Sequence, residues 1–257
     1  MNIGVYDSGL GGLTVLAALR AAGIAEHVTY FADQAHVPYG DKSDAELQIL
    51  LRDNLAWLEA NGVDVVAMGC NTSCAVAGRV GWPAASFAAP IQDLIRNGAR
   101  AFAGAPYRHV AVVATAATVR SGAYGDAIRA LAPNVIVDEI AAPALVPLVE
   151  AGAGESAEAR GAVAEIVARF APGVEALVYG CTHYPLLDAH FAAYAPGIAR
   201  IDPALEQARA VLALGVRTGT GGTTRYVTNG DPVAFETNIR RWTGDHTGIV
   251  TGLVATR

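Results

Sequence analysis

Two segments of this 257-residue chain share one pattern, and this internal repeat restricts the possible folds more than any other feature of the sequence. Residues 65–72 read VVAMGCNT and residues 176–183 read ALVYGCTH, with 111 positions between Cys70 and Cys181. Each segment is a short apolar run, then Gly-Cys, then two polar residues. Parallel strands can look alike by chance, but the shared Gly-Cys favours a true repeat. The sequence therefore predicts two halves of related layout, each with a cysteine directly after a buried strand.

Further short apolar runs alternate with helical stretches along the chain. One helix is predicted to begin at the capping box Ser43-Asp44-Ala45-Glu46 and to end at Gly62, and others are predicted over residues 13–22, 157–170 and 204–214. Buried strands are predicted at residues 3–6, 63–68, 110–114, 135–138, 176–179, 225–228 and 249–254. Apolar strands separated by helices are typical of parallel sheets that are covered on both faces. The predicted fold class is α/β.

The repeat and the chain length together predict how this α/β fold is divided. At 257 residues the chain exceeds the usual size of one domain. We predict two pseudo-symmetric domains, each a mainly parallel sheet flanked by helices: residues 1–92 plus 203–257 form the first, and residues 93–202 form the second. Ligands of such folds bind at the carboxyl ends of the strands, where both cysteines stand. The active site is expected in the interdomain cleft.

Charge and composition exclude several classes of protein. The formal charge is -6 and no run of Lys or Arg occurs, so a nucleic-acid partner is not expected. Hydrophobic residues make up 53% of the chain and charged residues 16%, which favours a globular fold over disorder. Apolar stretches are interrupted before the roughly 20 residues that a spanning helix requires, and the start lacks the basic region of a signal peptide. We expect a cytoplasmic protein without a membrane partner.

The cysteines need an explanation other than disulfide bonding. There are three of them, Cys70, Cys74 and Cys181, so any pairing leaves one over, and cytoplasmic thiols stay reduced. Inverting the Cα of an amino acid needs a base on one face and an acid on the other, and two opposed thiols meet that need symmetrically. A thiol ionises more readily at a helix N-terminus or beside a cation. The two repeat-related cysteines are therefore candidate proton carriers.

The surroundings of each cysteine fit this interpretation. Cys70 leads into a predicted helix, whose free N–H groups also suit a substrate carboxylate. Cys181 is followed by His183, and Pro185 suits the first position of the next helix. The alternative is that each cysteine is a small buried hydrophobe, the common fate of a free thiol. Cys74 has no repeat counterpart, and we expect it to pack inside its helix.

Four spaced motifs carry a resemblance to a known family. They are Asp7-Ser8-Gly9-Leu10-Gly11-Gly12-Leu13-Thr14-Val15, Val37-Pro38-Tyr39-Gly40-Asp41-Lys42-Ser43, Gly69-Cys70-Asn71-Thr72 and Gly180-Cys181-Thr182-His183-Tyr184-Pro185-Leu186-Leu187. The similarity continues through residues 146–150 and through Thr228-Asn229-Gly230-Asp231-Pro232, so it covers nearly the whole chain. In these motifs the sequence resembles the glutamate racemases of the aspartate/glutamate racemase family.

The resemblance implies a cofactor-independent isomerase that interconverts L-glutamate and D-glutamate. By this carry-over Cys70 takes the proton from the D-enantiomer and Cys181 takes it from the L-enantiomer, with Asp7 assisting the first thiol and His183 the second. The residues implied to contact the substrate are Asp7, Ser8, Tyr39, Gly40, Asn71, Thr72, Thr118, Thr182 and His183. The resemblance also implies a homodimer and a role in supplying D-glutamate for peptidoglycan.

Some features allow simpler interpretations or depart from the family pattern. Asp7 can cap the following turn, His183 can cap its helix, and Glu150 is interpreted as a solvated helix residue with a weak secondary role. A carboxylate near Cys70 must act by hydrogen bonding, since its charge alone raises the pKa of a thiol. Residues 88–92 read AAPIQ and lack a Pro-Gly-Ala pattern, which bears on the domain boundary more than on the chemistry.

Cofactor chemistry is not expected. Pyridoxal phosphate needs a Schiff-base lysine, and Lys42 is the only lysine in the chain. The glycines at residues 9–12 are not a dinucleotide fingerprint, because Thr14 stands where the third glycine belongs. The ligand spacing argues against a zinc site built from Cys70, Cys74, Cys181 and His183. The remaining alternatives are aspartate racemase, another cysteine-pair isomerase, and a hinged protein that binds a small acid without turning it over.

Overall fold

The computed structural model describes residues 1–81, 87–245 and 248–253, and it contains two parallel sheets. The first has the order β10-β9-β2-β1-β3-β4. Its strands are β1 (Asn2–Asp7), β2 (His27–Ala32), β3 (Val65–Met68), β4 (Ile91–Gln92), β9 (Thr224–Thr228) and β10 (Ile249–Gly252). The second has the order β6-β5-β7-β8. Its strands are β5 (His109–Ala114), β6 (Ile136–Ala141), β7 (Ala176–Gly180) and β8 (Ala199–Ile201).

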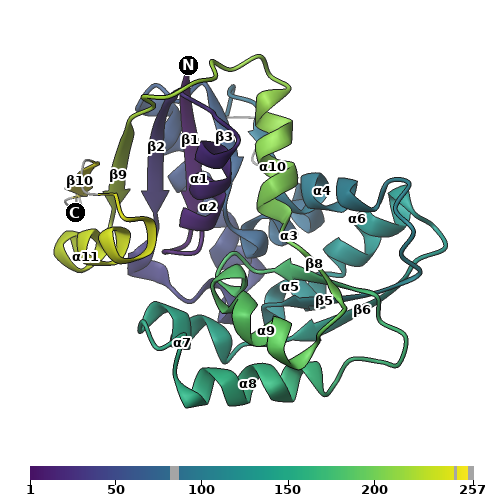
Figure 1. Cartoon of the computed structure of the whole chain (residues 1–257). Helices are drawn as coiled ribbons and strands as arrows, with labels where there is room; N and C mark the ends of the chain where they lie inside the picture. The colour runs from purple at the N-terminus through teal and green to yellow at the C-terminus, as the bar shows by residue number, and fades with distance from the viewer. Residues whose placement is uncertain (82–86, 246–247, 254–257) are drawn as a thin grey trace.

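Helices cover both faces of each sheet (Figure 1). Those connecting the strands of the first sheet are α1 (Leu13–Ala21), α2 (Asp44–Ala60), α3 (Asn71–Val80), α10 (Pro203–Leu212) and α11 (Pro232–Thr243). Those of the second are α4 (Leu94–Gly98), α5 (Ala116–Ser121), α6 (Ala123–Leu131), α7 (Leu145–Glu150), α8 (Ala157–Val167) and α9 (Asp188–Tyr194). Short 3-10 helices are η1 (Gln34–His36), η2 (Tyr39–Asp41), η3 (Ala99–Phe102) and η4 (Tyr184–Leu187). None of the helices in the described ranges is both long and apolar enough to cross a membrane.

Two buried clusters hold these layers together. The larger one fills the first sheet and its helices, and it continues through Tyr124 and Ile128 to one face of the second sheet. The smaller one packs α7, α8 and α9 on the other face of the second sheet, around Phe191. Trp242 of α11 packs against both clusters. This continuous apolar packing fixes the two sheets relative to each other, with β1 and β2 directed toward the second sheet (Figure 1).

The α/β class predicted from the sequence is confirmed, and so is the capping box of α2, where Ser43 and Glu46 bind each other's backbone N–H groups. The seven predicted strands all exist, although Val254, the last residue predicted for the seventh, lies outside the described residues. Three strands were missed. The strands β4 and β8 are very short, whereas β2 is a central strand with an evident apolar signal at residues 28–32.

The predicted division into domains agrees in outline with the two sheets. All described strands of the first sheet lie within residues 2–92 and 224–252, and those of the second lie within residues 109–201. The boundaries at residues 92 and 202 stay a prediction. Pro185 lies in the first turn of the next helix, as expected, although this helix is the 3-10 helix η4 and Pro185 is its second residue.

Candidate active site

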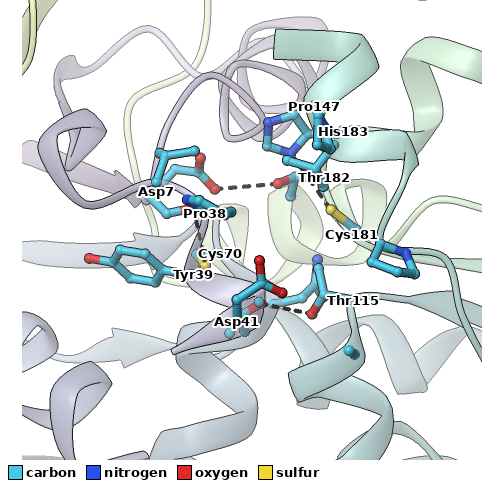
Figure 2. Close-up of a pocket in the computed structure, with 18 residues that line it drawn as sticks. Asp7, Pro38, Tyr39, Asp41, Cys70, Thr115, Pro147, Cys181, Thr182 and His183 are labelled. Atoms are coloured by element: carbon cyan, nitrogen blue, oxygen red, sulfur yellow. Dashed lines mark hydrogen bonds between the residues drawn. The ribbon is translucent and has the colours of Figure 1, made fainter. Parts of the chain in front are cut away.

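A single pocket gathers the carboxyl ends of strands from both sheets (Figure 2). It is lined by ten of the residues singled out from the sequence: Asp7, Ser8, Tyr39, Gly40, Cys70, Asn71, Thr72, Cys181, Thr182 and His183. It is also lined by Val37, Pro38, Asp41, Thr115, Ala116, Pro143, Val146 and Pro147. Cys70 follows β3 of the first sheet and Cys181 follows β7 of the second, so the two thiols enter the pocket from different halves of the molecule.

The Gly-Cys pattern of the repeat has a steric cause that is the same in both halves. A Cβ at Gly69 would lie 3.0 Å from the carbonyl oxygen of Tyr6 and 3.1 Å from Cα of Gly12. A Cβ at Gly180 would lie 2.7 Å from Cβ of Ala114 and 3.0 Å from the carbonyl oxygen of Val113. Each glycine thus lets its strand end press against the neighbouring strand. The following cysteine is thereby held at the rim of the pocket.

Cys70 is the N-cap residue of α3, as its position before a predicted helix indicated. Its Sγ accepts a hydrogen bond from the backbone N–H of Ser73 at 3.5 Å and donates to Oγ of Ser8 at 3.7 Å. Burial raises the pKa of this thiol to about 11, and the charge of Asp7 adds to the rise. The resting state of Cys70 is therefore the thiol, an acid that can deliver a proton.

Asp7 links the two halves of the site. Its carboxylate accepts from the backbone N–H of Gly9 at 2.7 Å and from Oγ1 of Thr182 at 3.3 Å, but its described hydrogen bonds do not include Cys70. Burial raises the pKa of Asp7 to about 6, against the lowering effects of His183 and of backbone N–H groups. Asp7 therefore acts on Cys70 through its charge, and not through the direct hydrogen bond that we expected.

Cys181 has a different kind of partner. Its Sγ lies 3.6 Å from Nδ1 of His183, and Nε2 of the same ring lies 2.6 Å from Oε1 of Glu150. Burial lowers the pKa of His183, but the hydrogen bonds to Cys181 and Glu150 outweigh it and raise this pKa well above its usual value. A protonated imidazole at this place favours a negative charge on the neighbouring sulfur. In the second half, therefore, the imidazole of His183 connects the thiol of Cys181 to the carboxylate of Glu150.

The interpretation of Glu150 as a solvated helix residue was wrong. Its side chain is only 19% exposed, and Oε1 also accepts from the backbone N–H of Leu10 at 3.1 Å, in addition to its bond to His183. The contact joins the end of α7 to the loop after β1, two segments far apart in sequence. No local pattern could indicate it, because the partners come together only through the packing of the two halves.

The N-terminal turn of α3 brings an unpaired hydrogen-bond donor to the pocket wall. Oδ1 of Asn71 accepts from the hydroxyl of Tyr124 at 2.6 Å, whereas Nδ2 is buried and has no partner. Thr72 lies beside it, with Oγ1 3.0 Å from Oγ1 of Thr115. Buried polar groups are nearly always paired, so the free Nδ2 of Asn71 indicates that a ligand oxygen belongs here. A carboxylate at a helix N-terminus meets this requirement.

Three further residues bear on the expected substrate contacts. Tyr39 lines the pocket, but its hydroxyl donates to Asp33, and Figure 2 shows it directed away from the two thiols. Thr118 is fully buried behind the wall, where its Oγ1 lies 3.0 Å from Oγ1 of Thr115. Thr115 was not among the expected substrate contacts, although it follows β5, the strand of the second half that corresponds to β1. Thr115 and not Thr118 faces the pocket.

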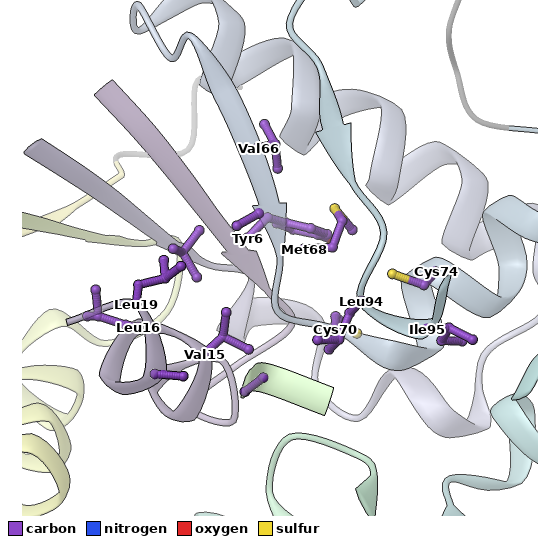
Figure 3. Close-up of a cluster of buried hydrophobic side chains, with 14 of the residues drawn as sticks. Tyr6, Val15, Leu16, Leu19, Val66, Met68, Cys70, Cys74, Leu94 and Ile95 are labelled. Atoms are coloured by element: carbon purple, nitrogen blue, oxygen red, sulfur yellow. The ribbon is translucent and has the colours of Figure 1, made fainter. Parts of the chain in front are cut away.

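Cys74 lies away from this pocket, on the other side of α3. It is buried next to Leu94 and Ile95 in the large core cluster (Figure 3), and burial raises the pKa of its thiol well above the usual value. Among the residues that the structure describes, no group of three or more His, Cys, Asp or Glu side chains could hold a metal ion. Cys74 therefore packs as an apolar residue, in agreement with the sequence-based expectation.

Comparison with known proteins agrees with this geometry. Residues 14–211 match the family model Asp/Glu/Hydantoin racemase. The chain is 41% identical over 247 residues to a glutamate racemase of Gloeobacter violaceus, covering 94% of this chain and 92% of that one. It is 37% identical over 251 residues to a glutamate racemase of Neisseria gonorrhoeae, with 94% and 92% covered.

Solved structures give the same result. Glutamate racemase from Thermus thermophilus in complex with beta-chloro-D-alanine superposes with a TM-score of 0.85 at 35% identity, covering 99% of this chain and 97% of that one. The RacE1 isoform from Bacillus anthracis has a TM-score of 0.89 at 26% identity, with 98% and 97% covered. Fold, thiol pair and sequence similarity lead to one conclusion: the chain belongs to the Asp/Glu/hydantoin racemase family.

Proposed function

We propose that this chain is a glutamate racemase that moves the Cα proton between Cys70 and Cys181. The observation that carries the proposal is that the two thiols enter one pocket from different halves, each with its own polar partner. A glutamate racemase from Francisella tularensis was solved in complex with D-glutamate and superposes with a TM-score of 0.88 at 27% identity. This relative supports glutamate as the substrate here.

The substrate is held by neutral donors in this proposal. No Arg or Lys is among the described residues that line the pocket, while the unpaired Nδ2 of Asn71 and the first turn of α3 offer hydrogen bonds to a carboxylate. Ser8, Thr72 and Thr182 supply further hydroxyl groups at the pocket wall. Tyr39 and Gly40 contribute shape rather than a free hydroxyl, and Thr118 supports Thr115 from behind.

Reaction from the L-enantiomer starts with Cys181 as thiolate beside protonated His183 and with Cys70 as thiol. Cys181 takes the Cα proton, the electron pair stays on Cα as a carbanion, and the Cys70 thiol returns a proton to the opposite face. After the reaction Cys181 is protonated and Cys70 is a thiolate. This is the form of the site that accepts the D-enantiomer. Asp7, with a pKa of about 6, can exchange a proton near the first thiol at neutral pH.

The test is the interconversion of pure L- and D-glutamate, followed by polarimetry on protein that has been dialysed and treated with chelator. We expect full turnover without metal or pyridoxal phosphate. Activity that is lost on this treatment and restored by zinc or by pyridoxal phosphate would overturn the two-thiol mechanism. Aspartate is assayed in parallel, and faster turnover of aspartate than of glutamate would correct the substrate but keep the mechanism. A protein that binds glutamate without racemising it would favour the non-catalytic alternative.

The wider biological assignment belongs to the same proposal. We infer a cytoplasmic homodimer that supplies D-glutamate for peptidoglycan, built from the two domains predicted above. Light scattering of the purified protein tests the dimer. Rescue of a bacterial strain that requires external D-glutamate tests the supply of the cell wall.

A further inference from the structure

The segment Thr228-Asn229-Gly230, which the family resemblance includes, has no part in the proposed chemistry, yet it contacts the turn after β2. Asn229 binds this turn twice: its Nδ2 donates to Oδ1 of Asp33 at 2.5 Å, and its Oδ1 accepts from the backbone N–H of Ala35 at 3.0 Å. Thr228 donates to Oε1 of Gln34 at 2.8 Å. The end of β9 is thus fastened to a turn nearly 200 residues earlier in the chain.

Gly230 is part of the same contact. A Cβ at this position would lie 2.8 Å from Cβ of Gln34, so only glycine lets the two backbones come this close. All three residues of the segment therefore act on residues 33–36, and none of them lines the substrate pocket.

Asp33 is the centre of this contact. It is fully buried, and its carboxylate accepts hydrogen bonds from four side chains. Nδ1 of His36 lies at 2.6 Å and Nδ2 of Asn54 at 2.9 Å, and Asn229 and the hydroxyl of Tyr39 are the other two donors. A buried carboxyl group with several donors holds their segments in one arrangement, because breaking any bond leaves a buried oxygen poorly satisfied.

One of these segments is the wall of the substrate pocket. Tyr39 opens the 3-10 helix η2, and its hydroxyl also lies 2.8 Å from the hydroxyl of Tyr6. The next residue, Gly40, approaches Thr115 of the second half so closely that a Cβ would lie 3.3 Å from Cβ of Thr115. The distance between the two halves at this wall therefore depends on where Asp33 holds Tyr39.

We propose that Asp33 and Asn229 are positioning residues, which hold the wall formed by residues 37–41 at the spacing that the substrate needs. For the identity of the substrate this inference rests on the proposed function. The wall carries no proton in that mechanism, so its displacement weakens the binding of both enantiomers to the same extent and leaves the proton transfer itself largely unchanged.

The decisive variant is Asn229→Ala, because Asn229 is only partly buried and its removal leaves the core intact. We expect KM to rise about fivefold for L- and D-glutamate alike, because the variant loses both hydrogen bonds to the turn and loosens the wall, while kcat changes less than twofold. Asn61→Ala is the matched control: this partly buried asparagine donates to the carbonyl oxygen of Trp57 at the end of α2, away from the pocket. Asp33→Asn is expected to give the same pattern with a larger rise in KM.

A second measurement does not depend on the substrate. Alkylation of Cys70 by iodoacetamide in the free protein, located by peptide mass spectrometry, should be faster in Asn229→Ala than in wild type and unchanged in Asn61→Ala. A folded Asn229→Ala protein with wild-type KM and wild-type labelling overturns the proposal, as does a rise in KM for one enantiomer only. If the wild type fails to racemise glutamate, the proposed function is wrong, and the labelling rates alone decide whether Asn229 positions the wall.

Discussion

The Cys70 half and the Cys181 half of the site share one backbone arrangement, but the groups that act on the protonation of each thiol differ. In both, a glycine packed on the neighbouring strand is followed by a cysteine at the rim of the pocket. Burial and the charge of Asp7 keep Cys70 protonated, against the lowering effect of its hydrogen bonds with Ser73 and Ser8. Cys181 meets an imidazole whose pKa is raised by its hydrogen bonds to Cys181 and Glu150.

The difference shows that the shared Gly-Cys pattern determines where the thiols are, while the residues around each cysteine, which differ between the halves, determine which one rests as the acid. The arrangement as it stands combines a thiol at Cys70 with an imidazole–carboxylate pair at Cys181, and this combination is the one that accepts the L-enantiomer in the proposed mechanism. The D-enantiomer requires the opposite distribution of protons. Variants of each half test this asymmetry.

The largest effect is expected from the thiols themselves. Cys70→Ser and Cys181→Ser should each lower racemisation by about 1000-fold or more, because a serine hydroxyl is too weak an acid to replace a thiol. Cys74→Ser should keep most of the activity, since this side chain packs in the core away from the pocket. Chiral chromatography of glutamate after incubation with each variant gives these rates.

The same variants show which face each thiol serves. An analogue with a β leaving group can eliminate after loss of its Cα proton, without an acid on the opposite face. Cys70→Ser should then process only the L-analogue and Cys181→Ser only the D-analogue, as chiral analysis of the remaining analogue would reveal. Equal elimination of both enantiomers by either variant, or an inactive Cys74→Ser, would overturn the assignment of Cys70 and Cys181 to opposite faces of the substrate.

The next effect concerns the partners of the thiols. His183→Asn should slow Cα hydrogen exchange from L-glutamate about 100-fold and from D-glutamate less, and Asp7→Asn should do the reverse. Initial exchange into deuterated water, measured for each enantiomer, reports the difference. The ratio of the two forms at equilibrium stays at one in every variant. Equal losses from both sides would mean that these residues support the pocket without serving one thiol each.

A smaller effect is expected at Glu150, which contacts His183 and not the sulfur of Cys181 itself. Glu150→Gln keeps an acceptor for His183 but removes the negative charge, so the pKa of His183 should fall. A protonated His183 is needed beside Cys181, and the alkaline limit of exchange from L-glutamate should therefore move to lower pH, with about a tenfold loss at pH 8. The control is Glu155→Gln, because Glu155 is 84% exposed and lies near His190 instead. An unchanged alkaline limit would remove Glu150 from this role.

The contrast between the halves also shows what could be predicted from the sequence. The apolar strands, the Gly-Cys pair and the start of α3 follow from local patterns, so the centre of the pocket was predictable. Glu150 was not, because its partners are brought to it only by packing between α7 and the loop after β1. The bond of Asp7 to Thr182 had the same cause, whereas its bond to Gly9 is the local turn cap that the sequence allowed. The strand β2 was predictable from its apolar residues and was overlooked.

The smallest effects concern stability, and they fall in a different pH range for each half. Asp7 has a pKa of about 6 in the folded protein, above its usual 3.8, so the folded state binds more protons between these values and loses stability as the pH rises from about 4 to 6. The pKa of His183 is also raised. The stabilisation that His183 contributes to the folded state is complete below about pH 6.5. It is lost as the pH rises through the higher pKa that His183 has in the folded protein.

Asp7→Asn should therefore stabilise the fold at neutral pH while it impairs catalysis. A pKa difference of this size corresponds to about 3 kcal/mol, and some of it is lost because the amide replaces only part of the hydrogen bonding to Gly9 and Thr182. Urea unfolding at pH 4 and at pH 7 measures the effect: the gain should be present at pH 7 and nearly absent at pH 4. Asp53→Asn, at a carboxylate that is 58% exposed, is the control and should change neither value. If Asp7→Asn is less stable than wild type at pH 7, the burial of the Asp7 carboxylate does not destabilise the fold, and this prediction is wrong.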